Sequence, residues 1–125
     1  MDTKKLKNNK YYIGKYNKFE KYKGWFIGSF FNDDDPRKTD KVEVQYKEQK
    51  KGHVCKSHYH KKKIELLIMI KGGAIFTING NRQKIKTGDF LFIDINNITS
   101  GEFTKDSKYF SIHAPSITDD KVLID

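Results

Sequence analysis

The feature that most restricts the fold of this chain is a set of short segments in which apolar and polar residues alternate. Such alternation occurs in residues 41–47, 75–78, 89–93 and 108–113, and turn residues bound each segment. Successive side chains of a strand point to opposite faces, so a period of two predicts half-buried strands. No segment carries a helical stripe of apolar residues. We therefore expect an all-β domain with little helix, built as a double-sheet jelly roll or a barrel.

One hairpin of this fold is predicted in detail by the pair Asn79-Gly80. Both residue types tolerate the positive φ angles that a tight two-residue turn requires. We expect this turn to join strands at residues 74–78 and 82–86.

The length of 125 residues predicts one domain with one core. Residues 1–23 are rich in Lys, Asn and Tyr, and we predict that they form an N-terminal arm. Residues 24–125 are predicted to form the barrel. The aromatic content of residues 11–31 is too high for a free tail. We expect this segment to supply edge strands or contacts with a partner subunit, and hence a homodimer.

Charge and hydropathy argue against two classes of partner, nucleic acids and membranes. The formal net charge is +9, but only Arg37 and Arg82 are arginines and the lysines are spread along the chain. Nucleic-acid readers usually concentrate arginine on one face, so we expect no nucleic-acid partner. The longest apolar stretch, residues 64–70, is interrupted by Glu65 and is too short to span a membrane. Cys55 has no second cysteine to pair with, which favours a reducing compartment, and we expect the cytoplasm.

The residues that carry chemistry are His58, His60 and Glu65. On an extended strand His58 and His60 project from the same face, on the order of 7 Å apart at their Cα atoms. If residues 61–63 form a turn, the carboxylate of Glu65 returns over the pair. Two imidazoles and one carboxylate hold Fe(II), Mn(II), Ni(II), Zn(II) or Co(II) and leave coordination positions open. We predict one divalent metal ion at these residues.

The full spacing of this stretch resembles a known family. Its residues are Gly52, five further residues, His58, one residue, His60, four residues, Glu65, six residues and Gly72. This spacing reproduces the first motif of the cupins, and the chain resembles a small single-domain cupin over residues 42–115. The resemblance implies a double-stranded β-helix with the metal at the barrel mouth and small-molecule chemistry beside it.

The second cupin motif is matched only at its opening strand, residues 88–93. The family usually continues with a Pro-x-Gly turn and a further metal-binding His. Here residues 94–98 form the turn, in which Asn96 and Asn97 tolerate left-handed backbone geometry, and Thr99 occupies the position of that His. Two alternatives stay open: a site with three protein ligands completed by water, or a member without metal.

Further candidate site residues are polar side chains on the expected strands. His113 lies on the closing strand and is a candidate metal ligand or acid–base group, although the alternation around it does not say which face is inside. Tyr59 is the second candidate catalytic residue. The candidate substrate-binding residues are Gln45, Tyr46 and Thr99. His53 and Cys55 have the opposite strand parity to His58 and are expected to take no part.

For function, the resemblance implies a metal-dependent isomerase or lyase that acts on a polar small molecule such as a sugar or a small acid. Two alternatives remain: a non-catalytic cupin that binds a sugar or another small molecule, and an Fe(II) dioxygenase. A dioxygenase consumes O₂, and a binding protein without metal is indifferent to chelator. Fold alone does not choose among these functions.

Overall fold

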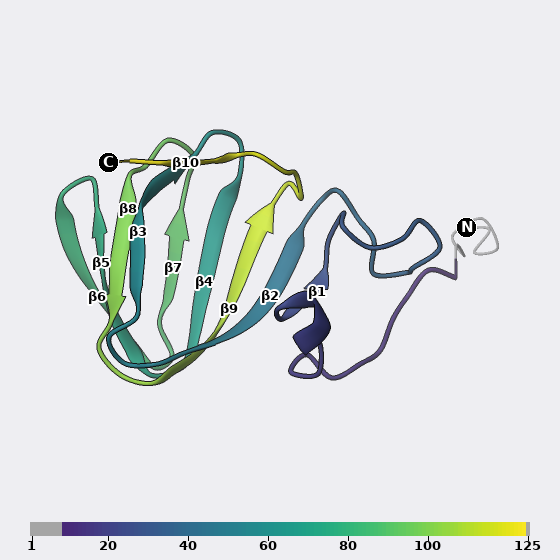
Figure 1. The fold of residues 1–125 in the computed structure, drawn as a ribbon, viewed down its shortest axis with the longest axis horizontal. Helices are drawn as coiled ribbons and strands as arrows, with labels where there is room; N and C mark the ends of the chain where they lie inside the picture. Colours follow the sequence, from purple (N-terminus) through teal and green to yellow (C-terminus); the bar gives the residue numbers. More distant parts are fainter. Residues whose placement is uncertain (1–8, 125) are drawn as a thin grey trace, which may run out of the picture.

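The computed structural model describes residues 9–124 of the chain, and its strands form two five-stranded antiparallel sheets that face each other (Figure 1). The predicted all-β class is confirmed, and residues 1–8 of the predicted arm lie outside the described residues. The first sheet has the order β1 (Trp25–Ile27), β2 (Glu43–Gln49), β9 (Ser107–Ala114), β4 (Ile64–Lys71) and β7 (Phe90–Ile93). The second has the order β10 (Lys121–Leu123), β3 (Val54–His60), β8 (Thr99–Phe103), β5 (Gly73–Ile78) and β6 (Asn81–Lys86).

The apolar core fills one end of the space between the sheets. Its members are Leu67, Met69, Ala74, Phe76, Ile85, Phe103 and Tyr109. Met69 and Phe103 are fully buried. The inward face of β4 continues past Leu67 to Glu65, where the interior changes from apolar to polar. The alternation of one strand therefore supplies both the core and the wall of a polar site.

Glycine and asparagine set the turns that hold the strands in register. Asn79 and Gly80 both have positive φ angles, of 50° and 85°, which confirms the predicted hairpin of β5 and β6. Gly72 has a φ of 126°, and a Cβ there would lie 2.2 Å from the hydroxyl of Ser107. Only glycine fits at that close approach, where β4 turns into β5.

Residues 9–37 extend beyond the β2 edge of the first sheet (Figure 1). They contain a 3₁₀ turn, η2 (Glu20–Tyr22), within the predicted arm, and β1, which pairs with β2 at the sheet edge. The guanidinium of Arg37 packs against four aromatic rings and pairs with Asp35 at 2.8 Å. The rings are those of Tyr12, Phe19, Tyr22 and Phe31. Residues 12–37 thus form a small cluster of their own outside the barrel core. Within residues 9–124 no helix has the length and apolar character that crossing a membrane would take.

Candidate metal centre

A β-bulge in β3 sets which side chains enter the barrel. Cys55 pairs with Gly101 and His58 pairs with Thr99, so β3 holds one more residue than β8 between these two pairs. An extra residue reverses the strand parity beyond it. Cys55, His58 and His60 therefore share the inward face, and Cys55 packs against the apolar core. The expectation that Cys55 lies off the face of His58 is wrong for this reason.

The turn between β3 and β4 brings Glu65 back over the histidines. His60 is the last residue of β3 and Glu65 is the second residue of β4. The carboxylate of Asp120 accepts the backbone N–H groups of Lys62 and Lys63, each at 2.9 Å. This buried acceptor satisfies backbone donors that the turn would otherwise leave unpaired.

The resulting donor set consists of His58, His60 and Glu65, and one donor atom from each lies within 4.8 Å of the others. Ligand atoms around a bound ion lie roughly 3–4 Å apart, so small movements suffice to close the set on a metal. Nε2 of His60 is 3.1 Å from Oε1 of Glu65. Nδ1 of His58 is 2.7 Å from the carbonyl oxygen of Lys56. A proton donated to that carbonyl leaves the lone pair of His58 on Nε2, the atom that would bind a metal.

The electrostatics of the site favour the protonation states that a metal requires. Burial raises the pKa of Glu65, but hydrogen bonds from His113 and His60 outweigh this and hold the pKa well below its usual range. Glu65 is therefore ionised at neutral pH. Burial lowers the pKa of His58, which favours its neutral form.

His113 faces inward, which answers the question that the strand alternation left open. Its Nε2 lies 3.4 Å from Oε1 of Glu65 and 3.3 Å from the hydroxyl of Ser111. Its ring contacts Trp25 edge-on, with centroids 5.8 Å apart. Its Nδ1 is buried and has no hydrogen-bond partner within the described structure. His113 thus belongs to the polar cluster beside the donor set.

Asp120 is a member of the cluster that sequence reasoning missed. Its Oδ2 lies 3.6 Å from Nδ1 of His60, a buried atom without a hydrogen bond in residues 9–124. Asp120 is the residue before β10, which pairs with β3 opposite His58 and His60. Nothing in the local sequence marks Asp120 out from Asp119, because its position depends on the pairing of two strands that are remote in sequence.

The other predicted site residues divide between the two faces of their strands. Thr99 is buried beside His58, on the inward face. Gln45 also faces inward, but its amide donates a hydrogen bond to the carbonyl oxygen of Lys23 in the arm at 2.8 Å.

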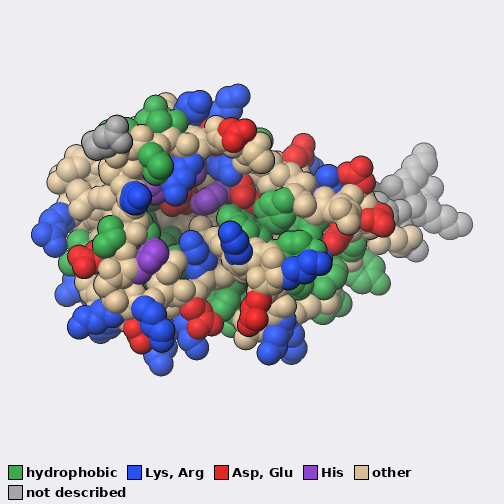
Figure 2. All heavy atoms as spheres, viewed as in Figure 1, with side chains coloured by type: hydrophobic (Ala, Val, Ile, Leu, Met, Phe, Trp, Pro, Cys, Tyr) green, Lys and Arg blue, Asp and Glu red, His purple; other side chains and the backbone are tan. Residues whose placement is uncertain are grey.

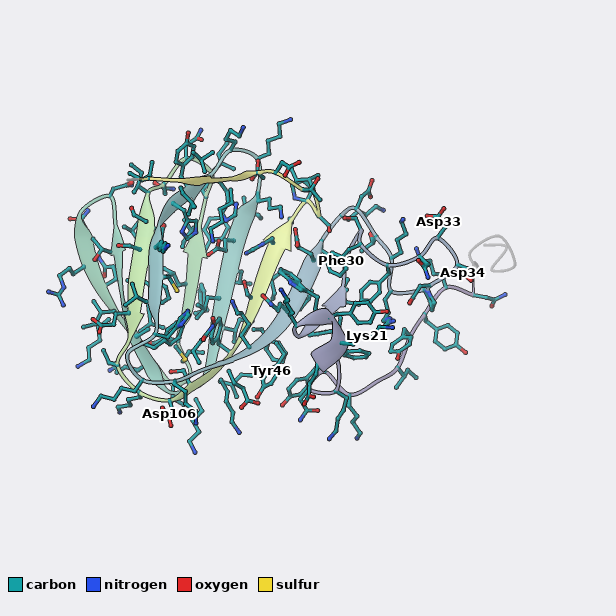
Figure 3. The ribbon with its side chains drawn as sticks, viewed as in Figure 1. Lys21, Phe30, Asp33, Asp34, Tyr46 and Asp106 are labelled. Carbon is teal, nitrogen blue, oxygen red and sulfur yellow. The ribbon has the colours of Figure 1, made fainter. Side chains whose placement is uncertain are left out.

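Tyr46 and Tyr59 are not brought to the cluster. Tyr46 follows Gln45 on one strand and so lies on the outer face, in contact with Tyr16 and near the arm (Figure 3). Tyr59 stands between the two inward histidines and points away from them by the same alternation. Adjacent strand residues cannot share a face, so Tyr46 and Tyr59 are not brought together with the other candidate catalytic and substrate-binding residues.

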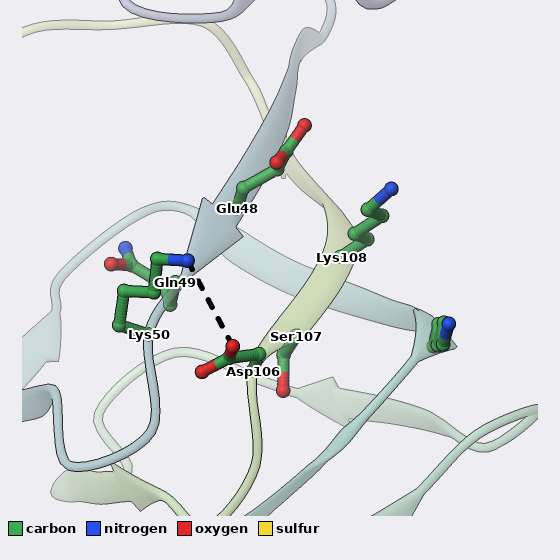
Figure 4. Close-up of a pocket in the computed structure, with 7 residues that line it drawn as sticks. Glu48, Gln49, Lys50, Asp106, Ser107 and Lys108 are labelled. Atoms are coloured by element: carbon green, nitrogen blue, oxygen red, sulfur yellow. Dashed lines mark ion pairs between the residues drawn. The ribbon is translucent and has the colours of Figure 1, made fainter.

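Figure 2 shows a hollow in the molecular surface with histidine side chains in it and lysine side chains around it. A separate pocket of about 220 Å³ lies around Asp106, at the opposite end of the barrel (Figures 3 and 4). Its lining includes Lys50, Lys108 and Glu48, and it has no metal-binding cluster. The chemistry of the described residues is therefore concentrated at the histidine end.

Comparison with known proteins agrees with this architecture. Residues 45–100 match the family model of the cupin domain. A conserved uncharacterised protein with a double-stranded β-helix domain, from Klebsiella pneumoniae subsp. pneumoniae MGH 78578, superposes with a TM-score of 0.63 at 20% identity, covering 70% of this chain and 77% of that one. KdgF from Halomonas sp. superposes with a TM-score of 0.61 at 16% identity, covering 65% and 74%.

A third structure is the Streptomyces nucleoside dehydratase Pac13, with a TM-score of 0.62 at 13% identity, covering 69% of this chain and 70% of that one. Identities this low show a shared fold and nothing more. No curated protein sequence matches the chain. The family match over residues 45–100 and the two facing sheets together show the double-stranded β-helix fold of the cupins.

Proposed function

We propose that this cupin holds one divalent metal ion on His58, His60 and Glu65 and is an isomerase or lyase that acts on a polar small molecule. The observation that carries the proposal is the convergence of the three donors within 4.8 Å between the two sheets. Their chemistry, two imidazoles and one ionised carboxylate, suits Fe, Mn, Ni, Zn or Co.

A bound ion would supply a Lewis acid that polarises a substrate oxygen. The side chains around it have separable tasks in this proposal. His113, whose Nδ1 is buried and unpaired in the described structure, is placed to hold or move a proton beside the ion. Trp25 covers the ring of His113 and would limit the access of water.

A non-catalytic binding cupin is the second candidate, and the environment of Thr99 favours it. Thr99 is buried opposite His58, where the cupin pattern usually supplies a further imidazole. A hydroxyl is a poor ligand for these ions, so the site has fewer protein ligands than a four-donor centre. A dioxygenase stays a third possibility because the same donors hold Fe(II).

The three functions respond differently to metal and oxygen. Protein loaded in turn with Fe, Mn, Ni, Zn and Co is tested against polar sugars and small acids, in air and without oxygen. The proposal predicts turnover that survives the removal of oxygen and stops with chelator. Turnover that requires oxygen supports the dioxygenase, and ligand binding that ignores chelator supports the binding protein. Either of these results contradicts the proposal.

We also propose that the protein forms a homodimer through the outer face of the first sheet. Strand register places two apolar rows there: Val44, Ile112, Leu66 and Phe92, and Tyr46, Phe110, Ile68 and Phe90. Tyr16 of the arm covers the β2 and β9 side of this face. On the β7 side, Phe90 is 69% and Phe92 52% exposed. A second copy offers a matching apolar face, in a chain whose surface is otherwise rich in lysine.

A further inference from the structure

Lys47 places a positive charge inside the barrel. It alternates on β2 with Glu43 and Gln45, both buried, and it pairs across the sheet with the buried Tyr109 of the core. Its side chain is half-buried. The side chain of Lys47 therefore starts from the inward face. It lies farther along β2 toward the apolar core than Glu43, which pairs with His113.

The ammonium of Lys47 makes no ion pair or hydrogen bond with any residue in the described part of the chain. The interior carboxylates are already engaged. Glu43 pairs with the ammonium of Lys63, and Glu65 contacts His60 and His113. Asp120 accepts the backbone N–H groups of the β3–β4 turn. None of these carboxylates forms an ion pair with Lys47 in the described part of the chain.

The groups that face Lys47 compensate its charge only in part. Burial lowers the pKa of Lys47, and the nearby charge of Lys121 acts in the same direction, whereas Glu65 attracts the ammonium without forming an ion pair with it. Burial raises the pKa of the Cys55 thiol, so this side chain is neutral at neutral pH. Lys121 adds a second positive charge. A cation taken out of water without a partner reduces stability, and such groups are retained where a ligand completes them.

We infer that Lys47 is the anion-binding residue of this barrel and that it takes the carboxylate of a small acidic substrate. The orientation of that substrate, with its hydroxyl or carbonyl end at the donor set of His58, His60 and Glu65, rests on the proposed function. The assignment selects a small acid or sugar acid over a neutral sugar. It also gives the interior a charge balance: a divalent ion, Glu65 and Lys47 sum to two positive charges, and an anionic substrate reduces that sum.

The position of Lys47 suits an anionic group rather than the reacting atoms. It lies on β2, whereas the donor set lies on β3 and β4. In this inference one small molecule contacts both the ammonium of Lys47 and the donor set. A charge-assisted hydrogen bond from an ammonium to a carboxylate is about twice as strong as a neutral one. The net charge of +9 on the chain adds a long-range attraction for anions.

The test uses matched probes that differ only in their acidic group. Binding of gluconate and of sorbitol, and of lactate and of propane-1,2-diol, is measured by calorimetry at low ionic strength. The variants are Lys47→Met, Lys47→Arg and, as a control, Lys84→Met, which removes one exposed charge from β6. Metal content is measured in every sample, with and without prior treatment with chelator.

The inference predicts that at least one acid binds the original protein about tenfold or more tightly than its matched polyol. Lys47→Met is expected to lose this preference, while Lys47→Arg and Lys84→Met keep it within about threefold. Lys47→Met is also expected to raise the melting temperature of the ligand-free protein, because it removes an unpaired interior charge.

Three results would overturn the assignment. The first is an acid that binds Lys47→Met as tightly as it binds the original protein, and the second is an original protein with no preference for acids. The third is a lower melting temperature for Lys47→Met, which would make the lysine structural. Metal content separates this inference from the proposed function. Acid binding through Lys47 in a protein that holds no metal would sustain the anion site and reject the metal centre.

Discussion

Oδ2 of Asp120 lies 3.6 Å from Nδ1 of His60, while Nε2 of the same ring lies 3.1 Å from Oε1 of Glu65. One imidazole thus stands between two carboxylates, one from the middle of the sequence and one from its C-terminal segment. At 3.6 Å the carboxylate does not accept a hydrogen bond, but a small approach would let Nδ1–H donate to it and leave Nε2 for a metal. We therefore expect the C-terminal segment to help orient the proposed centre.

Asp120→Asn is expected to weaken metal binding about 10–100-fold, because it removes the charge that orients His60 but preserves the shape of the side chain. Zn²⁺ affinity, measured in competition with a chromophoric chelator, checks this. The matched control is Asp119→Asn, an exposed neighbour. Equal affinities for Asp120→Asn and the original protein would mean that the 3.6 Å contact has no orienting role.

The depressed pKa of Glu65 gives a prediction about acid stability in the metal-free protein. A carboxylate whose folded pKa is lowered contributes stability above its unfolded value, near 4.5, and loses it as pH falls below that value. The difference in unfolding free energy between the original protein and Glu65→Gln should therefore shrink from about pH 5 to about pH 3. Urea unfolding at these pH values measures it. Parallel pH curves for the two proteins would show that the ionised Glu65 does not stabilise the fold.

His113→Ala is expected to retain the metal with an affinity within about threefold of the original, because three protein donors remain. Titration with Co²⁺ followed by its visible absorption reports both affinity and coordination. If His113→Ala lost the metal as fully as His58→Ala, His113 would be a fourth ligand rather than an acid–base group.

The proposed dimer face is tested by introducing charged side chains into it. Phe90→Lys with Phe92→Lys places two cations in the apolar rows and should yield a monomer by light scattering, since unpaired charges in an interface core are costly. Val54→Lys is the control, because Val54 is exposed to a similar degree on the other sheet. A dimer that persists in the double variant, or a monomeric original protein, would contradict the proposal.

Much of the fold could be predicted because it depends on local rules. The Asn79-Gly80 hairpin and the alternating strands follow from turn chemistry and a period of two, and the structure has both. The close approach of the donor set could also be predicted, because His58, His60 and Glu65 lie on consecutive strands joined by one turn.

What the sequence could not supply is information that arises between remote strands. The extra residue in β3 is visible only in the pairing with β8, and it moves Cys55 onto the face of His58. Asp120 reaches His60 through the pairing of β10 with β3. The face of His113 depends on the register of β9 against β2 and β4. Strand alternation alone places Gln45 and Tyr46 on opposite faces of β2, so the two side chains cannot bind one substrate together.

The metal content of protein purified without a histidine tag, measured by mass spectrometry of the elements, tests the central claim most directly. The account predicts about one equivalent of a single divalent transition metal in the original protein and less than about a tenth of an equivalent after His58→Ala or His60→Ala, because each ligand of a three-donor site is needed. An original protein that stays empty in the presence of Fe, Mn, Ni, Zn and Co would contradict the account, as would a variant lacking both histidines that still holds a full equivalent.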